Sequence, residues 1–192
     1  MHRLSSSFVL GYHGCDRAVA DRLLAGEPLK PSANEWDWLG PGAYFWEANP
    51  KRGLVFAAEA AKRQGSSIKD PVVIGAVLDL GLCLDLTTYS GTAWIRIAHK
   101  SLVEVQKIAG KPMPRNHGDS LRRYLDCAVI KRLHGILAEM GQPTLDTVKG
   151  VFVEGDPVYP DAGFRQKTHV QIAVCNPECI KAIFAVPPRQ LR

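Results

Sequence analysis

The chain has 192 residues, 46% of them hydrophobic and 22% charged, a composition that suits one globular domain with a sizeable core. The formal net charge of +5 permits an acidic partner such as a dinucleotide or a nucleic acid. The five cysteines form no CxxC pair and no apolar stretch reaches transmembrane length, which excludes a disulfide scaffold and an integral membrane protein. We therefore expect a reduced cytoplasmic protein without a signal peptide or a membrane contact.

The N-terminal part of the sequence predicts a strand, a helix and a loop, in that order. The strand covers residues 8–12 and ends in His13-Gly14. Asp16 is of a type that caps helices, and apolar residues at helical spacing follow it until Gly26. The next segment contains two prolines, a serine and an asparagine, which is typical of a loop.

The segment Trp38–Glu47 combines a turn with three consecutive aromatic residues. Its Gly40-Pro41-Gly42 sequence excludes a helix interior and predicts a tight turn that opens into a strand over residues 43–46. Gly42 would let a ligand approach the backbone, and Tyr44 would be placed to stack on a planar ligand. A hairpin turn that leads into a core strand explains the same residues, so both interpretations stay open.

The rest of the chain predicts strands interrupted by helices. Asn49 is expected to cap a helix that starts at Pro50 and runs to about residue 64. Apolar patterns predict further strands at 72–80, 82–86, 148–153, 169–174 and 180–186, and helices at 91–109 and 121–140. The pattern therefore predicts an α+β fold in a single domain over residues 1–192, with a mostly helical insertion at about 88–141.

Three segments resemble, in chain order, the ADP-ribosyltransferase superfamily of the diphtheria-toxin and poly(ADP-ribose)-polymerase type. They are Tyr12-His13-Gly14, the Leu39–Phe45 segment with its LGPGAYF sequence, and the Gln171–Pro177 segment. The first two are similar to the family's His-Gly strand and LGxGxYF strand, and the third is similar to the late strand that carries a catalytic glutamate. The resemblance implies a split antiparallel β-sheet core and NAD as the substrate.

The resemblance also implies roles for individual residues. His13 would bond a ribose hydroxyl, the Gly14 backbone would bond the carboxamide, and Tyr44 would stack on the nicotinamide ring. Phe56, on the following helix, would supply the opposite wall. The residues expected to bind NAD are therefore His13, Gly14, Gly42, Tyr44 and Phe56.

The third segment departs from the family, because Gln171 stands where a glutamate is usual. Cleavage of the nicotinamide–ribose bond develops positive charge on the ribose, as in glycoside cleavage, and a glutamine can bond a hydroxyl but offers no negative charge. Glu154, which opens the loop before the Gln171 strand, is our candidate for the missing acid or for an acceptor-side base. The expected catalytic residues are therefore His13, Glu154 and Gln171. His13 as a core histidine and Glu154 as an ordinary turn carboxylate remain the plainer interpretations.

Three functions follow from these residues. The first is a mono-ADP-ribosyltransferase that modifies a nucleic acid or a protein, such as a bacterial toxin of a toxin–antitoxin or phage-defence pair, with an antitoxin as partner. The second is an NAD- or ADP-ribose-binding module that has lost activity, and the third is an NAD-dependent RNA 2′-phosphotransferase. The scattered histidines predict no metal site. The basic residues of the candidate acceptor side are Lys111, Arg115, Arg122, Arg123, Lys131, Arg132, Arg165 and Lys167.

Overall fold

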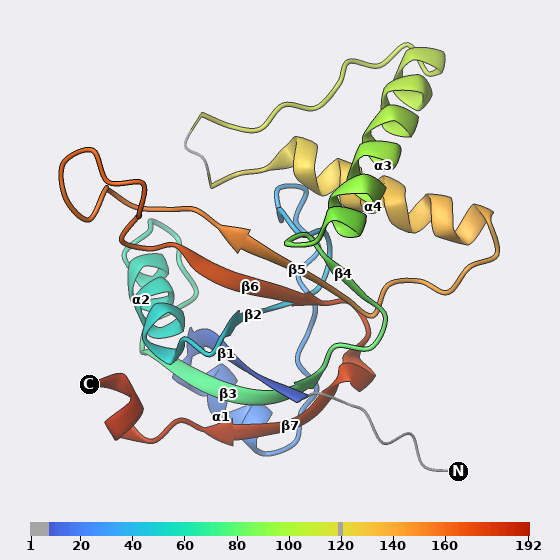
Figure 1. Ribbon diagram of the computed structural model, residues 1–192. Coiled ribbons are helices and arrows are strands. Elements are labelled where there is room, and N and C mark those ends of the chain that lie inside the picture. The colour runs from blue at the N-terminus through green and yellow to red at the C-terminus, as the bar shows by residue number, and fades with distance from the viewer. Residues whose placement is uncertain (1–7, 119–120) are drawn as a thin grey trace.

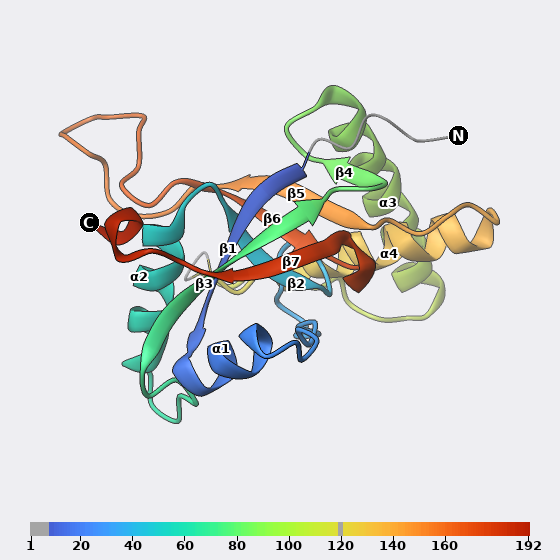
Figure 2. The ribbon, with the colours of Figure 1, turned by 90° about the horizontal axis from the view of Figure 1, so that it is seen from below.

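The computed structural model describes residues 8–118 and 121–192 and has the predicted α+β architecture (Figures 1 and 2). The expectation about a signal peptide falls mainly on residues outside these ranges. The strands are β1 (Phe8–Asp16), β2 (Ala43–Glu47), β3 (Pro71–Asp79), β4 (Cys83–Asp85), β5 (Thr147–Phe152), β6 (His169–Val174) and β7 (Ile180–Ala185). The α-helices are α1 (Arg17–Leu24), α2 (Pro50–Ala61), α3 (Tyr89–Ile108) and α4 (Tyr124–Glu139).

The strands form one sheet in the order β4-β5-β6-β2-β1-β3-β7. All neighbours are antiparallel except β4 and β5, which are parallel. The join between β1 and β2 is short, because it consists of the pairs Gly11–Glu47 and Tyr12–Trp46. β1 nevertheless stays paired with β3 as far as Asp16. The described strands thus form one sheet that is continuous across this short join, and the split core that the resemblance implies remains a prediction.

Each face of the sheet has its own hydrophobic core. Phe45, Ile172 and Val174 pack with α1 on one face, whereas Ala173 and Val148 pack with α3 and α4 on the other. Side chains alternate between faces along a strand, which explains why neighbours such as Ala173 and Val174 enter different cores. Figure 1 shows α1 on the opposite side of the sheet from α3 and α4.

The helix α2 packs on β1 and β3, at the other end of the sheet from α3 and α4 (Figure 1). Its N-terminus is capped as expected, since the Asn49 side chain accepts a hydrogen bond from the Arg52 N–H at 3.0 Å and Pro50 occupies the first turn. Close packing depends on two glycines, because a Cβ added to Gly14 would lie 2.1 Å from the carbonyl oxygen of Gly53.

Most element bounds agree with the expected ones to within one to three residues. The largest difference is in β1, which continues to Asp16 instead of ending at Tyr12, because β3 supplies pairing partners along its whole length. Asp16 still caps α1, accepting a hydrogen bond from the Ala18 N–H at 3.0 Å. The two helices α3 and α4 occupy the stretch expected to be mostly helical.

No helix in the described part of the chain combines the length and the apolar character that crossing a bilayer requires.

Gly14→Ala should destabilise the protein by about 1–3 kcal/mol, because the new methyl group would force α2 away from β1. Urea unfolding would measure the loss. The matched control is Gly163→Ala, since an added Cβ there meets no atom within 4 Å. Equal stability of the two variants would show that the contact between α2 and β1 is not tight.

Candidate functional site

A cleft of about 870 Å³ opens beside the short join of β1 and β2, and its volume is typical of a ligand-binding site. It is lined by six of the seven residues that the sequence predicted for the site. The expected residues that line it are His13, Gly42, Tyr44, Phe56, Glu154 and Gln171, while Gly14 is not among the lining residues. Strands β1, β2 and β6 and helix α2 thus bring together residues that are far apart in the sequence.

The side chain of His13 takes the place of a backbone hydrogen bond at the end of the β1–β2 ladder. If the pairing continued, Gly14 would lie opposite Tyr44. Instead, His13 Nδ1 lies 2.9 Å from the carbonyl oxygen of Tyr44. A carbonyl only accepts, so Nδ1 carries the proton and Nε2 of the neutral ring is left as an acceptor. Burial lowers the pKa of His13 and keeps this neutral form.

The hydrogen bond between His13 and the Tyr44 carbonyl group also affects the backbone of Gly14. The Ala48 N–H donates to the carbonyl oxygen of Leu10, and backbone groups alternate between the two edges of a strand. The N–H and C=O of Gly14 therefore face the β2 side, beyond the last residue pair of that ladder. At this edge the resemblance predicts that a carboxamide binds. The need for a glycine at position 14 has a second explanation, because a side chain there would collide with Gly53.

Tyr44 lines the cleft, and its hydroxyl is fixed by the preceding turn. The hydroxyl donates to the carbonyl oxygen of Gly40 at 2.8 Å and accepts from the Leu39 N–H at 3.0 Å. Burial raises the pKa of Tyr44, so the hydroxyl stays protonated. Tyr44 can therefore offer an aromatic surface, but it cannot serve as a base.

Gln171 is held by Trp38, a contact that the sequence did not reveal. The indole Nε1 of Trp38 donates to Gln171 Oε1 at 2.6 Å, and since an indole only donates, this bond fixes which way the amide points. The amide nitrogen is then the group that can donate to a ligand. Gly150, the cross-strand partner of Gln171, makes this possible, because a Cβ there would lie 2.7 Å from the Trp38 ring.

Glu154 lies in the same cleft but away from Gln171. On β6, Gln171 pairs with Gly150 of β5, whereas Glu154 accepts at its carbonyl oxygen from the Lys167 N–H. Four residues of extended chain separate these positions, which is about 13 Å. Glu154 therefore belongs to the α2 side of the cleft, where Arg52 contacts it.

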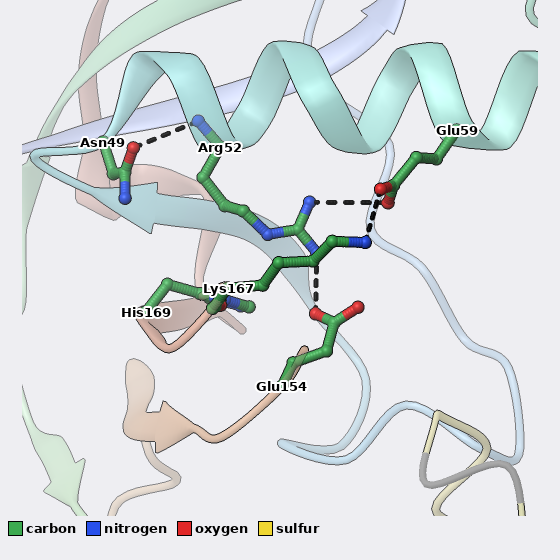
Figure 3. A network of polar contacts seen from close by, with 6 residues as sticks. All are labelled: Asn49, Arg52, Glu59, Glu154, Lys167 and His169. Atoms are coloured by element: carbon green, nitrogen blue, oxygen red, sulfur yellow. Dashed lines mark hydrogen bonds and ion pairs between the residues drawn. The ribbon is translucent and has the colours of Figure 1, made fainter. Parts of the chain in front are cut away.

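The carboxylate of Glu154 is engaged by Arg52 of α2, as Figure 3 shows. Arg52 Nη2 lies 2.7 Å from Glu154 Oε2, and its Nη1 lies 3.8 Å from Glu59 Oε2. Lys167 Nζ completes the group with a bond of 2.6 Å to Glu59 Oε1. The sequence reasoning missed Arg52, although Arg52, Phe56 and Glu59 recur at helical spacing, as residues on one face of a helix do.

His169 and Trp46 lie next to each other in the cleft. The two rings lie 6.0 Å apart, and both residues are buried and line the cleft. His169 Nδ1 donates to the carbonyl oxygen of Lys167 at 2.6 Å. Within residues 8–118 and 121–192, neither His169 Nε2 nor Trp46 Nε1 has a hydrogen-bond partner.

Asp37 is the carboxylate nearest in sequence to the Gly40-Pro41-Gly42 turn, and the sequence analysis did not predict it as a site residue. It lines the cleft and accepts hydrogen bonds from the Ser32 hydroxyl at 2.6 Å and the Asn34 N–H at 3.1 Å. Among the described residues, no group of three or more His, Cys, Asp or Glu side chains is arranged to hold a metal ion.

Comparison with protein-family models, with curated proteins and with solved structures finds no match to this chain. The likeness of the three segments to ADP-ribosyltransferases therefore remains a prediction.

The protein should lose stability as the pH falls below about 6.5, the ordinary pKa of histidine. Burial lowers the pKa of His13, His134 and His169 in the folded state. The unfolded chain then binds more protons than the folded one between the lowered values and 6.5, so the free energy of unfolding decreases in this window. Urea unfolding at about pH 7.5 and pH 5.5 would measure the effect.

The double variant with His13→Gln and His169→Gln should weaken this pH dependence and leave the part that His134 contributes. An unchanged pH dependence in that variant would show that the two buried histidines do not carry the effect.

Proposed function

We propose that the protein is an NAD-dependent mono-ADP-ribosyltransferase that modifies a macromolecule, either a nucleic acid or a protein. The observation that carries the proposal is that His13, Tyr44 and Gln171, from three segments that resemble the same family, line one cleft. Its volume of about 870 Å³ falls in the range of small-molecule sites and leaves room for a dinucleotide.

The residues near the β1–β2 separation would hold the nicotinamide and its ribose. The outward edge of Gly14 would bond the carboxamide and Tyr44 would offer its ring as a stacking surface. His13 Nε2 would accept a hydrogen bond from a ribose hydroxyl, and the amide nitrogen of Gln171 would donate one. Phe56 and the indole of Trp46, with ring centroids 4.8 Å apart, would form the wall on the α2 side.

Transfer would break the bond between the ribose C1′ and the nicotinamide nitrogen, and nicotinamide would leave with the electron pair. A lone pair of the acceptor would form the new bond to C1′, and the acceptor's proton would pass to a base. Glu154 is our candidate for this base, since it is the carboxylate at the end of β5 on the α2 side of the cleft. Its position matches a general base better than a group that stabilises charge on the ribose.

Cationic side chains at the cleft suit a phosphate-bearing substrate or acceptor. In the described part of the chain, five cations line the cleft beside three carboxylates: Lys30, Arg52, Arg63, Arg122 and Lys167 against Asp37, Glu59 and Glu154. This excess of positive charge favours binding of phosphate groups. The role as a toxin, the antitoxin partner and the cytoplasmic location remain predictions.

A second candidate function, an NAD- or ADP-ribose-binding module without activity, is favoured by one observation. All three carboxylates that line the cleft in the described part of the chain have partners: Asp37 with Ser32, Glu59 with Lys167, and Glu154 with Arg52. Gln171 adds no charge. A cleft in which every acid is paired would bind the dinucleotide without helping to break it.

Nicotinamide release from NAD distinguishes the two functions. We expect wild-type protein to release nicotinamide when the correct acceptor is present. Glu154→Gln should lower the rate about 100-fold or more, as loss of a general base does, and His13→Ala should lower it because the hydrogen bond to the ribose is lost. RNA, DNA, 2′-phosphorylated RNA and cell lysate would be supplied in separate reactions. Glu139→Gln is the matched control, because this acid pairs with Arg132 on α4, away from the cleft.

Gln171→Glu tests for a gain of activity instead of a loss. The new carboxylate would still accept the Trp38 hydrogen bond and would add the missing negative charge. We expect it to raise nicotinamide release. NAD binding without release in the wild type, together with release in the Gln171→Glu variant, would establish the binding module instead. No binding of NAD to either protein would remove both functions.

A further inference from the structure

Arg52 is a buried cation whose hydrogen-bonding capacity is mostly unused. Arg52 is 8% exposed to solvent, and its guanidinium lies 5.9 Å from the centre of the Trp46 ring. A guanidinium has five N–H donors, and Nη2 donates one hydrogen bond, to Glu154. Nε and Nη1 have no hydrogen-bond partner anywhere in the described residues. Buried polar groups are normally satisfied, so such a side chain needs an explanation.

The neighbours of Arg52 do not supply the missing bonds. Glu59 approaches Nη1 only to 3.8 Å, which is too far for a hydrogen bond, and its carboxylate is bonded to Lys167 at 2.6 Å. Trp46 Nε1 is a further buried donor that lacks a partner within the described ranges. Figure 3 shows the Arg52 side chain reaching between Glu59 and Glu154, with Lys167 beside it.

These groups together suit a phosphate. Arginine binds phosphate through two parallel N–H donors, and Nε with an adjacent Nη presents such a pair. Lys167 adds a second positive charge. Phe56, Trp46 and Phe152 line the same cleft and would accommodate the apolar parts of a nucleotide.

We propose that Arg52 and Lys167 form a phosphate-binding subsite, and that a bound phosphate competes with Glu154 for Arg52 and so releases the Glu154 carboxylate. Before binding, Glu154 offsets the buried charge of Arg52, which would otherwise be strongly destabilising. A phosphate brings more negative charge and several acceptor oxygens, so it can satisfy Nε and Nη1 and replace Glu154 at Nη2. Glu154 would then become available as a base only when the substrate is in place. This second step rests on the proposed function, whereas the subsite itself does not.

Binding of inorganic pyrophosphate, measured by calorimetry, tests the subsite without any need for turnover. We expect Glu154→Gln to tighten pyrophosphate binding about tenfold, because the competing carboxylate is removed and the charge of Arg52 is left uncompensated. Arg52→Lys should weaken binding by a similar factor, because lysine lacks the paired donors. The matched control is Glu47→Gln, which breaks the ion pair with Lys149 and should leave pyrophosphate binding unchanged.

If the ion pair between Arg52 and Glu154 is purely structural, Glu154→Gln should bind pyrophosphate equally well or more weakly than the wild type. Either result would overturn the proposal. Failure of both the wild type and Glu154→Gln to bind pyrophosphate would overturn it as well. Thermal unfolding checks that the variant is folded and reports ligand binding by a second method. Without pyrophosphate, Glu154→Gln should be less stable than the wild type, and it should gain more stability than the wild type when pyrophosphate is added.

Two further ligands show which phosphate the subsite takes. If Glu154→Gln tightens NAD binding but not binding of a short RNA or DNA oligonucleotide, the phosphate is that of the dinucleotide, and the reverse result assigns it to the acceptor. Tighter pyrophosphate binding without nicotinamide release under any condition would support the subsite and reject the transferase. Release of nicotinamide with unchanged pyrophosphate affinities would support the transferase and reject the subsite.

Discussion

The separation of β1 from β2 after two residue pairs is the constraint on which the cleft depends. The carbonyl oxygen of Tyr44 is bonded by His13 Nδ1 at the point where a longer ladder would have used the Gly14 N–H. The His13 side chain thus lies where the pairing ends, its tautomer is fixed by the bond to Tyr44, and the backbone edge of Gly14 on the β2 side lies beyond the last residue pair. β1 keeps its shape there because β3 pairs with it along its full length, and because α2 packs against it through Gly14 and Gly53.

The second constraint is the buried charge of Arg52. A guanidinium in the interior must be paired, and Glu154 supplies the partner at 2.7 Å. The same contact that stabilises α2 against the end of β5 therefore occupies the carboxylate that would act on an acceptor. In our proposal, Arg52 and Glu154 stay paired until a negatively charged ligand binds. Ligand binding would then free the Glu154 carboxylate to act as a base.

Much of the fold could be predicted from local signals in the sequence. The caps Asp16 and Asn49 mark the starts of α1 and α2 as expected, and the bounds of β6 are those that the alternating pattern predicts. The full length of β1 could not be predicted, because residues 13–16 are held in the strand by pairing with β3, which is distant in the sequence. The continuity of the sheet across β1 and β2 likewise depends on only two pairs.

The resemblance of three segments to one family led us to expect His13, Tyr44 and Gln171 in a common site, and all three line one cleft. The neighbours that determine what these residues can do were not predictable. Trp38 reaches Gln171 only because Gly150 leaves space across the strands, and Arg52 meets Glu154 only because α2 lies beside the end of β5. Such contacts arise from packing between distant segments, and no local pattern encodes them.

We propose that the cleft beside the short join of β1 and β2 holds the nicotinamide half of NAD. A crystal structure of the protein with a carbocyclic NAD analogue, whose nicotinamide cannot leave, would test it most directly. We predict that the carboxamide lies within hydrogen-bonding distance of the Gly14 backbone, that the ring lies against Tyr44, and that a phosphate lies at Arg52. An analogue bound elsewhere on the protein, or a cleft whose residues do not touch it, would contradict the account.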